Sequence, residues 1–181
     1  MNRFTYILIV LLFSSKLNSQ VLNLDSIKSK YSNTDTTVYI YMTALWCSPC
    51  LDKMPYYDAF FSKTKKPYKI IYLFDIEKFS NRELKRIFPF IDFSNCIAFI
   101  PEQFYPTAII QINSHNRMFK NFIKNHKEKT WQIKGIDNFN LSSFIVLPPR
   151  ENAFVIDAPK IKGMKLIEVE SLFDSILVQN K

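Results

Sequence analysis

The chain has 181 residues, a formal net charge of +8 and only two glycines. So few glycines exclude the glycine-rich loops that cradle phosphates. Three cysteines are too few for a disulfide scaffold. The basic residues are scattered without a nucleic-acid-binding motif, so we expect no nucleic acid, and in particular no DNA, as a partner.

The first 19 residues have the layout of a secretory signal peptide. A positive start that includes Arg3 precedes an unbroken apolar run over 6–13, and small and polar residues follow it. We expect cleavage near Ser19/Gln20, which makes the protein exported, periplasmic or otherwise extracytoplasmic. An uncleaved membrane anchor is the alternative, although the run is short for a bilayer span of about 20 residues.

The remaining segment, 20–181, is long enough for one domain with its own core. Residues 37–43 (TVYIYMT) and 69–74 (KIIYLF) are almost continuous apolar runs rich in β-branched and aromatic residues, which predicts two buried strands. Between them, apolar residues at three- and four-residue spacings predict a helix over 48–64.

Five further elements are predicted after the second strand. They are a helix over 80–88, strands over 108–112, 117–123 and 153–156, and a closing amphipathic helix over 167–178. This order predicts an α/β fold with a central mixed sheet flanked by helices. Residues at about 125–165 show little regular pattern, and we interpret them as an irregular C-terminal extension.

Two of the three cysteines lie between the first strand and the first helix, in the run Trp46-Cys47-Ser48-Pro49-Cys50. Unpaired N–H groups and the macrodipole at a helix N-terminus favour negative charge, which lowers the pKa of the first thiol. The three-residue spacing places both cysteines on one helical face, close enough to form a disulfide. We therefore predict Cys47 as the exposed nucleophile and Cys50 as the buried resolving thiol, with Pro49 accommodated in the first helical turn.

This run, together with Met54-Pro55 in the helix and Tyr105-Pro106-Thr107 before a later apolar strand, resembles the thioredoxin superfamily. It is most similar to the exported TlpA-like branch. The resemblance implies a thioredoxin-like fold in which Pro106 is a cis-proline beside the cysteine pair and Tyr105 contacts the backbone of the bound partner. Trp46 would pack beside the pair and shape the docking of that partner.

The activity implied by this resemblance is thiol–disulfide exchange without a cofactor. The partners would be protein thiols and disulfides, and the TlpA-like likeness favours a reductant supplied with electrons by a membrane or periplasmic donor. A DsbA-like oxidant is the opposite direction of the same chemistry, and the reduction potential separates the two.

Three positions depart from the family pattern. Tyr41 and Ile71 stand where thioredoxins often have a buried acid and its lysine partner, and Lys53 stands where TlpA-like proteins often have a glutamate. The proton acceptor for the resolving thiol is therefore open. Asp52 and Asp75 are the nearest acids in the sequence, and each is also interpretable as a solvated surface residue.

Two other classes of function remain as alternatives. A zinc-binding module would need a Cys₃His ligand set, for which the candidates are Cys47, Cys50, Cys96 and either His115 or His126. A non-catalytic binding or assembly protein would use the same fold with structural cysteines. Outside the zinc alternative, Cys96 is interpreted as a small buried apolar residue.

Overall fold

The computed structural model describes residues 34–44, 47–74, 97–99, 134–135 and 141–180, together with the isolated residues 27, 30, 31, 86, 89, 117 and 121. Several predicted features lie outside these residues: the signal peptide 1–19, most of the helix 80–88, the strand 108–112, and Trp46, Asp75, Cys96, Tyr105, Pro106, His115 and His126. Within the described part of the chain, no helix is long and apolar enough to cross a membrane.

Five strands form one mixed sheet in the order β3-β2-β1-β4-β5. Their bounds are β1 Thr37–Thr43, β2 Tyr68–Phe74, β3 Ile97–Phe99, β4 Ser143–Leu147 and β5 Phe154–Asp157. The first three strands are parallel, whereas β4 runs antiparallel to β1 and β5 antiparallel to β4. All residues of the central β1 are buried, which explains its continuous apolar sequence.

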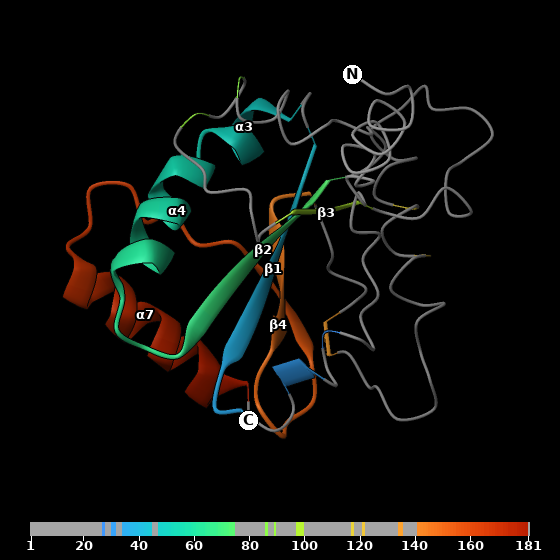
Figure 1. Ribbon diagram of the computed structural model, residues 1–181, viewed down its shortest axis with the longest axis vertical. Coiled ribbons are helices and arrows are strands. Elements are labelled where there is room, and N and C mark those ends of the chain that lie inside the picture. The colour runs from blue at the N-terminus through green and yellow to red at the C-terminus, as the bar shows by residue number, and fades with distance from the viewer. Residues whose placement is uncertain are drawn as a thin grey trace, which may run out of the picture.

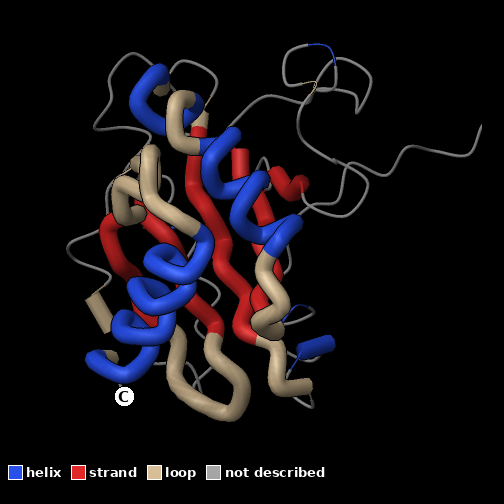
Figure 2. The backbone as a smooth tube through the Cα atoms, turned by 90° about the vertical axis from the view of Figure 1, so that its left-hand side faces the viewer, coloured by secondary structure: helices blue, strands red, loops and turns tan. Residues whose placement is uncertain are grey.

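Two helices cover one face of this sheet, as the two views in Figure 1 and Figure 2 show. They are α4, Met54–Lys63, and α7, Leu166–Gln179. The single-turn helix α3, Ser48–Leu51, follows β1 and leads into α4. Phe60 of α4 stacks on Phe173 of α7 with ring centroids 5.0 Å apart, so the two helices are joined directly over the sheet.

Aromatic rings fill the space between the helices and the sheet. Tyr39 meets Phe173 edge to face at 5.0 Å between centroids, and Tyr41 meets Tyr57 in the same way at 5.1 Å. Phe144 of β4 lies 5.0 Å from Tyr57. Edge-to-face contacts of this kind add about 0.5–1.5 kcal/mol per pair to the stabilisation from burial. The core therefore fixes α4 and α7 against β1 and β4.

The predicted strands 37–43 and 69–74 are confirmed as β1 and β2, and the closing helix 167–178 is confirmed as α7. The predicted fold class, an α/β protein with a central mixed sheet and packed helices, is also confirmed. The predicted strand 117–123 is wrong at Arg117 and Asn121, which are helical. The Asn and Ser residues before it favour a turn but also a helix N-cap, and the hairpin interpretation ignored the second preference.

The helix predicted over 48–64 is divided into α3 and α4, which is a correction to the sequence interpretation. Pro55 has no N–H to donate to the carbonyl of Leu51, and its ring would clash with that carbonyl in a continuous helix. The chain therefore ends α3 at Leu51, turns through Asp52 and Lys53, and begins α4 so that Pro55 lies in its first turn.

The irregular extension predicted at about 125–165 contains two regular strands. The predicted strand 153–156 is confirmed as β5, Phe154–Asp157. Residues 143–147, which were not predicted as a strand, form β4 and pair with the central strand. β4 is buried throughout, and periodicity alone does not distinguish so short an apolar run from a buried helix segment. Pro148-Pro149 after it ends the strand and begins the connection to β5.

Candidate functional site

Cys47 and Cys50 form a disulfide at the start of α3, with their Cα atoms 5.2 Å apart. Cys47 is the N-cap of α3, and its carbonyl oxygen accepts hydrogen bonds from the N–H groups of Cys50 and Leu51 at 2.9 and 3.0 Å. The Cys47 N–H donates to the carbonyl of Ala44 at 3.0 Å, which ties the motif to the end of β1. The strand and the helical turn together hold the cysteine pair in place.

The two sulfur-bearing residues differ in exposure. Cys50 is completely buried, whereas Cys47 is half-buried and Pro49 between them is exposed. The predicted burial of Cys50 is confirmed, whereas Cys47, which was predicted to be exposed, is half-buried. Thiol attack on a partner requires access, and in this arrangement Cys47 is the cysteine that a partner can reach.

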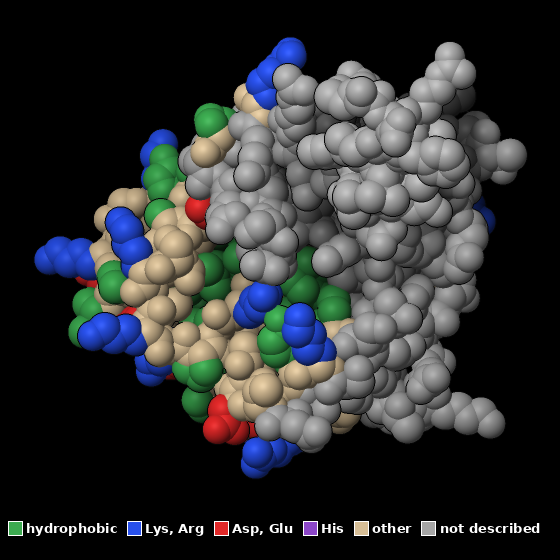
Figure 3. Space-filling view, viewed as in Figure 1, with side chains coloured by type: hydrophobic (Ala, Val, Ile, Leu, Met, Phe, Trp, Pro, Cys, Tyr) green, Lys and Arg blue, Asp and Glu red, His purple; other side chains and the backbone are tan. Residues whose placement is uncertain are grey.

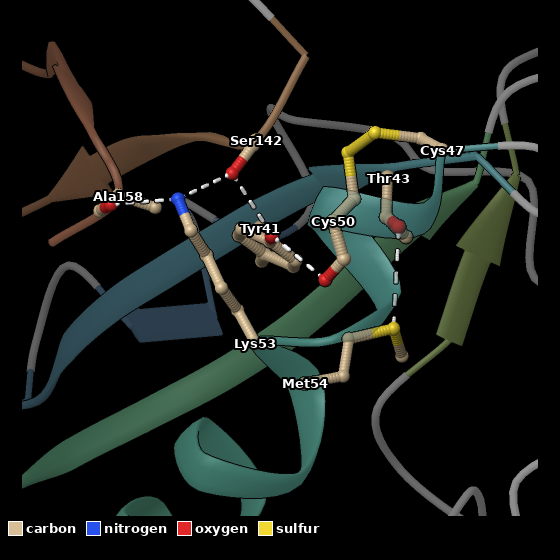
Figure 4. Close-up of a disulfide and its surroundings, with 8 residues drawn as sticks. All are labelled: Tyr41, Thr43, Cys47, Cys50, Lys53, Met54, Ser142 and Ala158. Carbon is tan, nitrogen blue, oxygen red and sulfur yellow. Dashed lines mark hydrogen bonds between the residues drawn. A yellow bond between two sulfur atoms is a disulfide. The ribbon is translucent and has the colours of Figure 1, made fainter. Parts of the chain in front are cut away.

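A chain of polar groups leads to the Cys50 carbonyl, and Figure 4 shows its members. Tyr41 in this chain is buried, whereas Lys53 and Ser142 are half-buried. The Tyr41 hydroxyl donates to the carbonyl oxygen of Cys50 at 3.0 Å and lies 3.1 Å from the Ser142 hydroxyl. The Lys53 ammonium donates to Ser142 at 2.8 Å and to the carbonyl oxygen of Ala158 at 3.1 Å.

The direction of these hydrogen bonds follows from the chemistry of the groups. The Cys50 carbonyl can only accept, so the Tyr41 hydrogen is committed to it, and an ammonium can only donate. Ser142 must then accept from Lys53 and donate to Tyr41. All donors point from the charged amine toward Cys50, so each hydrogen bond polarises the next.

Ser142 occupies its place because the backbone there is unusual. Its φ of 71° lies in the left-handed region, which costs a residue other than glycine about 1 kcal/mol or more. Its N–H donates to the carbonyl of Met42 at 3.1 Å, one residue out of the register in which β4 pairs with β1. This hydrogen bond holds the hydroxyl within reach of both Tyr41 and Lys53.

Burial governs the protonation of this chain of groups. Burial raises the pKa of Tyr41 to about 12, against the opposing effect of the Ser142 hydrogen bond, so the hydroxyl stays neutral at physiological pH. Burial also lowers the pKa of Lys53; the nearby charge of Lys160 lowers it further, and Asp157 opposes both. The ammonium is therefore easier to deprotonate than that of a solvated lysine.

Sequence reasoning recognised Tyr41 and Lys53 only as departures from a family pattern and missed Ser142. The signal for Ser142 is absent from local sequence, because its partners lie 89 and 101 positions away. Asp52, offered as a substitute proton acceptor, is exposed in the turn between α3 and α4. Its side chain lines a neighbouring hollow.

That hollow has a volume of about 510 Å³ and adjoins the cysteine motif through Pro49. It is lined by residues of the α3–α4 segment and of the connection between β5 and α7: Pro49, Asp52, Lys53, Tyr56, Lys160, Ile161 and Lys162. Three of these seven side chains are lysines and one is an acid. The hollow therefore has an excess of positive charge beside the cysteine pair.

The other predicted site residues are not all placed. Trp46, Tyr105 and Pro106 lie outside the described residues, so their roles stay predictions. No peptide bond in the described residues is cis. The loop that approaches Cys50 within those residues is 141–142, directly before β4.

The ligand set of the zinc alternative is not assembled by the described residues. Cys47 and Cys50 are bonded to each other, and Cys96, His115 and His126 lie outside the described part. Among the residues that are described, no group of three or more histidine, cysteine, aspartate or glutamate side chains could hold a metal ion.

No protein-family model matches the chain, and no curated protein matches it. A search of solved structures finds a thioredoxin from Wuchereria bancrofti with 14% sequence identity and a TM-score of 0.37, over 82% of this chain and 87% of that one. The described strands and helices themselves define a thioredoxin-like α/β protein: a parallel β1–α–β2 unit, an antiparallel β4–β5 hairpin beside β1, a closing helix, and a Cys-x-x-Cys disulfide after β1.

Proposed function

We propose that this protein is an exported thiol–disulfide oxidoreductase that reduces disulfides in other proteins. The observation that carries the proposal is the Cys47–Cys50 disulfide, with one cysteine accessible and the other buried. The fold and the cysteine pair support exchange chemistry. Export and the reducing direction rest on the signal-peptide pattern and on the TlpA-like resemblance of the sequence.

The exchange proceeds in two steps that conserve atoms and electrons. In the reduced protein, the Cys47 thiolate attacks one sulfur of the partner disulfide and forms a mixed disulfide, while the other partner sulfur leaves as a thiolate. Cys50 then loses its proton and attacks Cys47, which releases the second partner sulfur. Two electrons pass to the partner, and the Cys47–Cys50 disulfide remains.

The cycle closes when a dithiol donor at the membrane or in the periplasm reduces the Cys47–Cys50 disulfide. In the oxidised form the accessible Cys47 sulfur is the one that such a donor can attack. The pair carries the electrons itself, so the proposed activity requires no cofactor. Trp46, Tyr105 and Pro106 are proposed to shape and bind the backbone of the partner.

Trapping of the mixed disulfide tests the proposal. Cys50→Ser should leave Cys47 joined to partner proteins, because the group that resolves the intermediate is absent. Cys47→Ser should abolish exchange, because the accessible nucleophile is lost. The measurement is non-reducing electrophoresis of the exported fraction, followed by mass spectrometry of the adducts. If Cys50→Ser forms no more adducts than Cys47→Ser, the proposed exchange activity is wrong.

A further inference from the structure

The hollow beside the cysteine motif is lined by more basic than acidic side chains. Lys160 and Lys162 are exposed, and neither forms an ion pair within the described residues. The amine of Lys162 lies 5.8 Å from the centre of the Tyr56 ring. Lys53, from the opposite wall, is close enough to Lys160 for the two charges to repel. Asp52 is the only acid in the lining.

The segment that carries two of these lysines is held in a fixed shape. Ala158 donates its N–H to the carbonyl of Ser142 at 3.1 Å and accepts from Lys53, and the carbonyl of Pro159 accepts the Tyr57 hydroxyl. Ile161 is buried between the two exposed lysines. The lysines are thus presented from an anchored backbone, which lowers the ordering cost of binding.

A turn completes this anchoring. The N–H of Met164 donates to the carbonyl of Ile161 at 3.1 Å, and Gly163 between them has a φ of 83°. A positive φ at this position suits a glycine. The connection between β5 and α7 is therefore closed by its own hydrogen bond before the helix begins.

The position of the hollow determines which part of a bound partner polypeptide can enter it. Pro49 lies between the two cysteines and also lines the hollow. An extended polypeptide spans about 3.3 Å per residue. A partner joined to Cys47 can therefore reach the hollow with a few residues beside its own cysteine. The described part of the face in Figure 3 shows more Lys and Arg than Asp and Glu side chains.

We propose that this hollow binds an acidic segment of the partner polypeptide beside the partner cysteine that Cys47 attacks. The inference rests on the proposed function and adds a substrate class to it: protein disulfides flanked by Asp or Glu. A carboxylate in the hollow would relieve the repulsion between Lys53 and Lys160 and accept hydrogen bonds from the ammonium groups. Basic flanks would add to that repulsion.

The test compares two disulfide-linked peptides that differ only in Glu or Gln at the positions flanking the cysteine. The reduced protein is mixed with each peptide, and the second-order rate of peptide reduction is measured by acid quench and mass spectrometry. We expect the Glu peptide to react roughly tenfold faster in about 0.01 M salt, through electrostatic steering. The difference should almost vanish in about 1 M salt, where the Debye length is about 3 Å.

Two charge-matched variants locate the effect. Lys160→Gln/Lys162→Gln should lose most of the preference for the Glu peptide. Lys63→Gln/Lys65→Gln removes the same charge from exposed positions at the far end of α4 and beyond it, and should keep the preference. Equal rates for the two peptides with the unaltered protein, or an equal loss in both variants, would overturn the inference while leaving exchange intact. Reduction of neither peptide would overturn the proposed function, and the inference with it.

Discussion

Tyr39 and Tyr41 lie two positions apart on β1, point to the same face of the sheet, and are both completely buried. Their hydroxyls differ in hydrogen bonding. Tyr41 donates to Cys50 and contacts Ser142, whereas the Tyr39 hydroxyl has no hydrogen-bond partner in the described structure. Burial raises the pKa of both hydroxyls, so each is a neutral polar group inside the core.

This contrast predicts opposite effects of the same chemical change. Tyr41→Phe should lower the free energy of unfolding by about 1–2 kcal/mol, because it removes the hydrogen bonds of the Tyr41 hydroxyl to the Cys50 carbonyl and to Ser142. Tyr39→Phe should be neutral or raise it by up to about 1 kcal/mol, because it removes an unpaired buried hydroxyl. Urea unfolding of the oxidised protein measures both, and equal losses in the two variants would show that the contrast is wrong.

At the scale of the elements, α7 is linked to the segment that joins α4 to β2. Asp174 of α7 accepts the hydroxyl of Tyr68 and forms an ion pair with Lys66 at 3.0 Å. Thr64 at the end of α4 donates to Glu170 of α7 at 2.6 Å. These polar contacts border the aromatic packing of the two helices, and they place a titratable carboxylate at their junction.

Acid should weaken this junction. The Tyr68 hydrogen bond, followed by Lys66, lowers the pKa of Asp174 below 3.8, against a smaller opposing effect of partial burial. The carboxylate therefore stabilises the fold above pH about 4, and this contribution is lost as the pH falls through the lowered pKa. Asp174→Asn should cost less than about 1 kcal/mol at neutral pH, because the pair is exposed.

The measurement is urea unfolding of the unaltered protein and Asp174→Asn from pH about 6 down to about 2.5. The difference between them should shrink as the carboxylate becomes protonated. Asp35→Asn is the matched control, because Asp35 also faces a cation, Arg150 at 3.5 Å, but its side chain is 86% exposed. A difference that stays constant with pH would contradict the role given to Asp174.

At the scale of the whole molecule, the direction of electron flow depends on whether the oxidised or the reduced form is more stable. A reductant should have a reduction potential near −250 mV or lower, whereas a DsbA-like oxidant lies near −120 mV because its reduced form is the more stable one. We expect the low value, and with it a higher urea midpoint for the oxidised protein than for the reduced protein. Equilibration in thiol–disulfide buffers, with alkylation of free thiols, gives the potential.

A potential near −120 mV and a more stable reduced form would reverse the proposed direction without affecting the exchange chemistry. Cys47→Ser/Cys50→Ser is the control for the unfolding measurement, because it has the same fold but cannot change redox state. Its midpoint should be independent of the buffer potential. A dependence in this variant would mean that Cys96 contributes to the response of the unaltered protein.

Much of the architecture was predictable because the information is local. The apolar runs of β1 and β2 and the period of α7 are each contained in a short stretch of sequence, and the cysteine motif follows β1 directly. The helix break was missed because Pro55 was placed inside one continuous helix, although it lacks the N–H that such a helix requires.

The other features could not be predicted because they depend on distant parts of the chain. β4 was hidden in a segment that looked irregular, and its place beside β1 is set by pairing between residues such as Val38 and Leu147. The polar chain beneath Cys50 and the lysine-lined hollow both need β4, β5 and the connection after them to be in place. The local motif was thus sufficient to predict the cysteine pair, whereas the residues around the pair could be identified only from the structure.

The position of β1 between β2 and β4 has a consequence for biogenesis. β1 and the cysteine pair leave the ribosome about a hundred residues before Ser142, which is 101 positions from its contact on Tyr41. Until β4 is synthesised, the central strand has an unpaired edge, and closing so long a loop makes this step slow relative to local helix formation. The cysteines, three positions apart, can meanwhile oxidise in the unfolded chain. Until β4 is synthesised, the open edge of β1 is therefore available for non-native strand pairing.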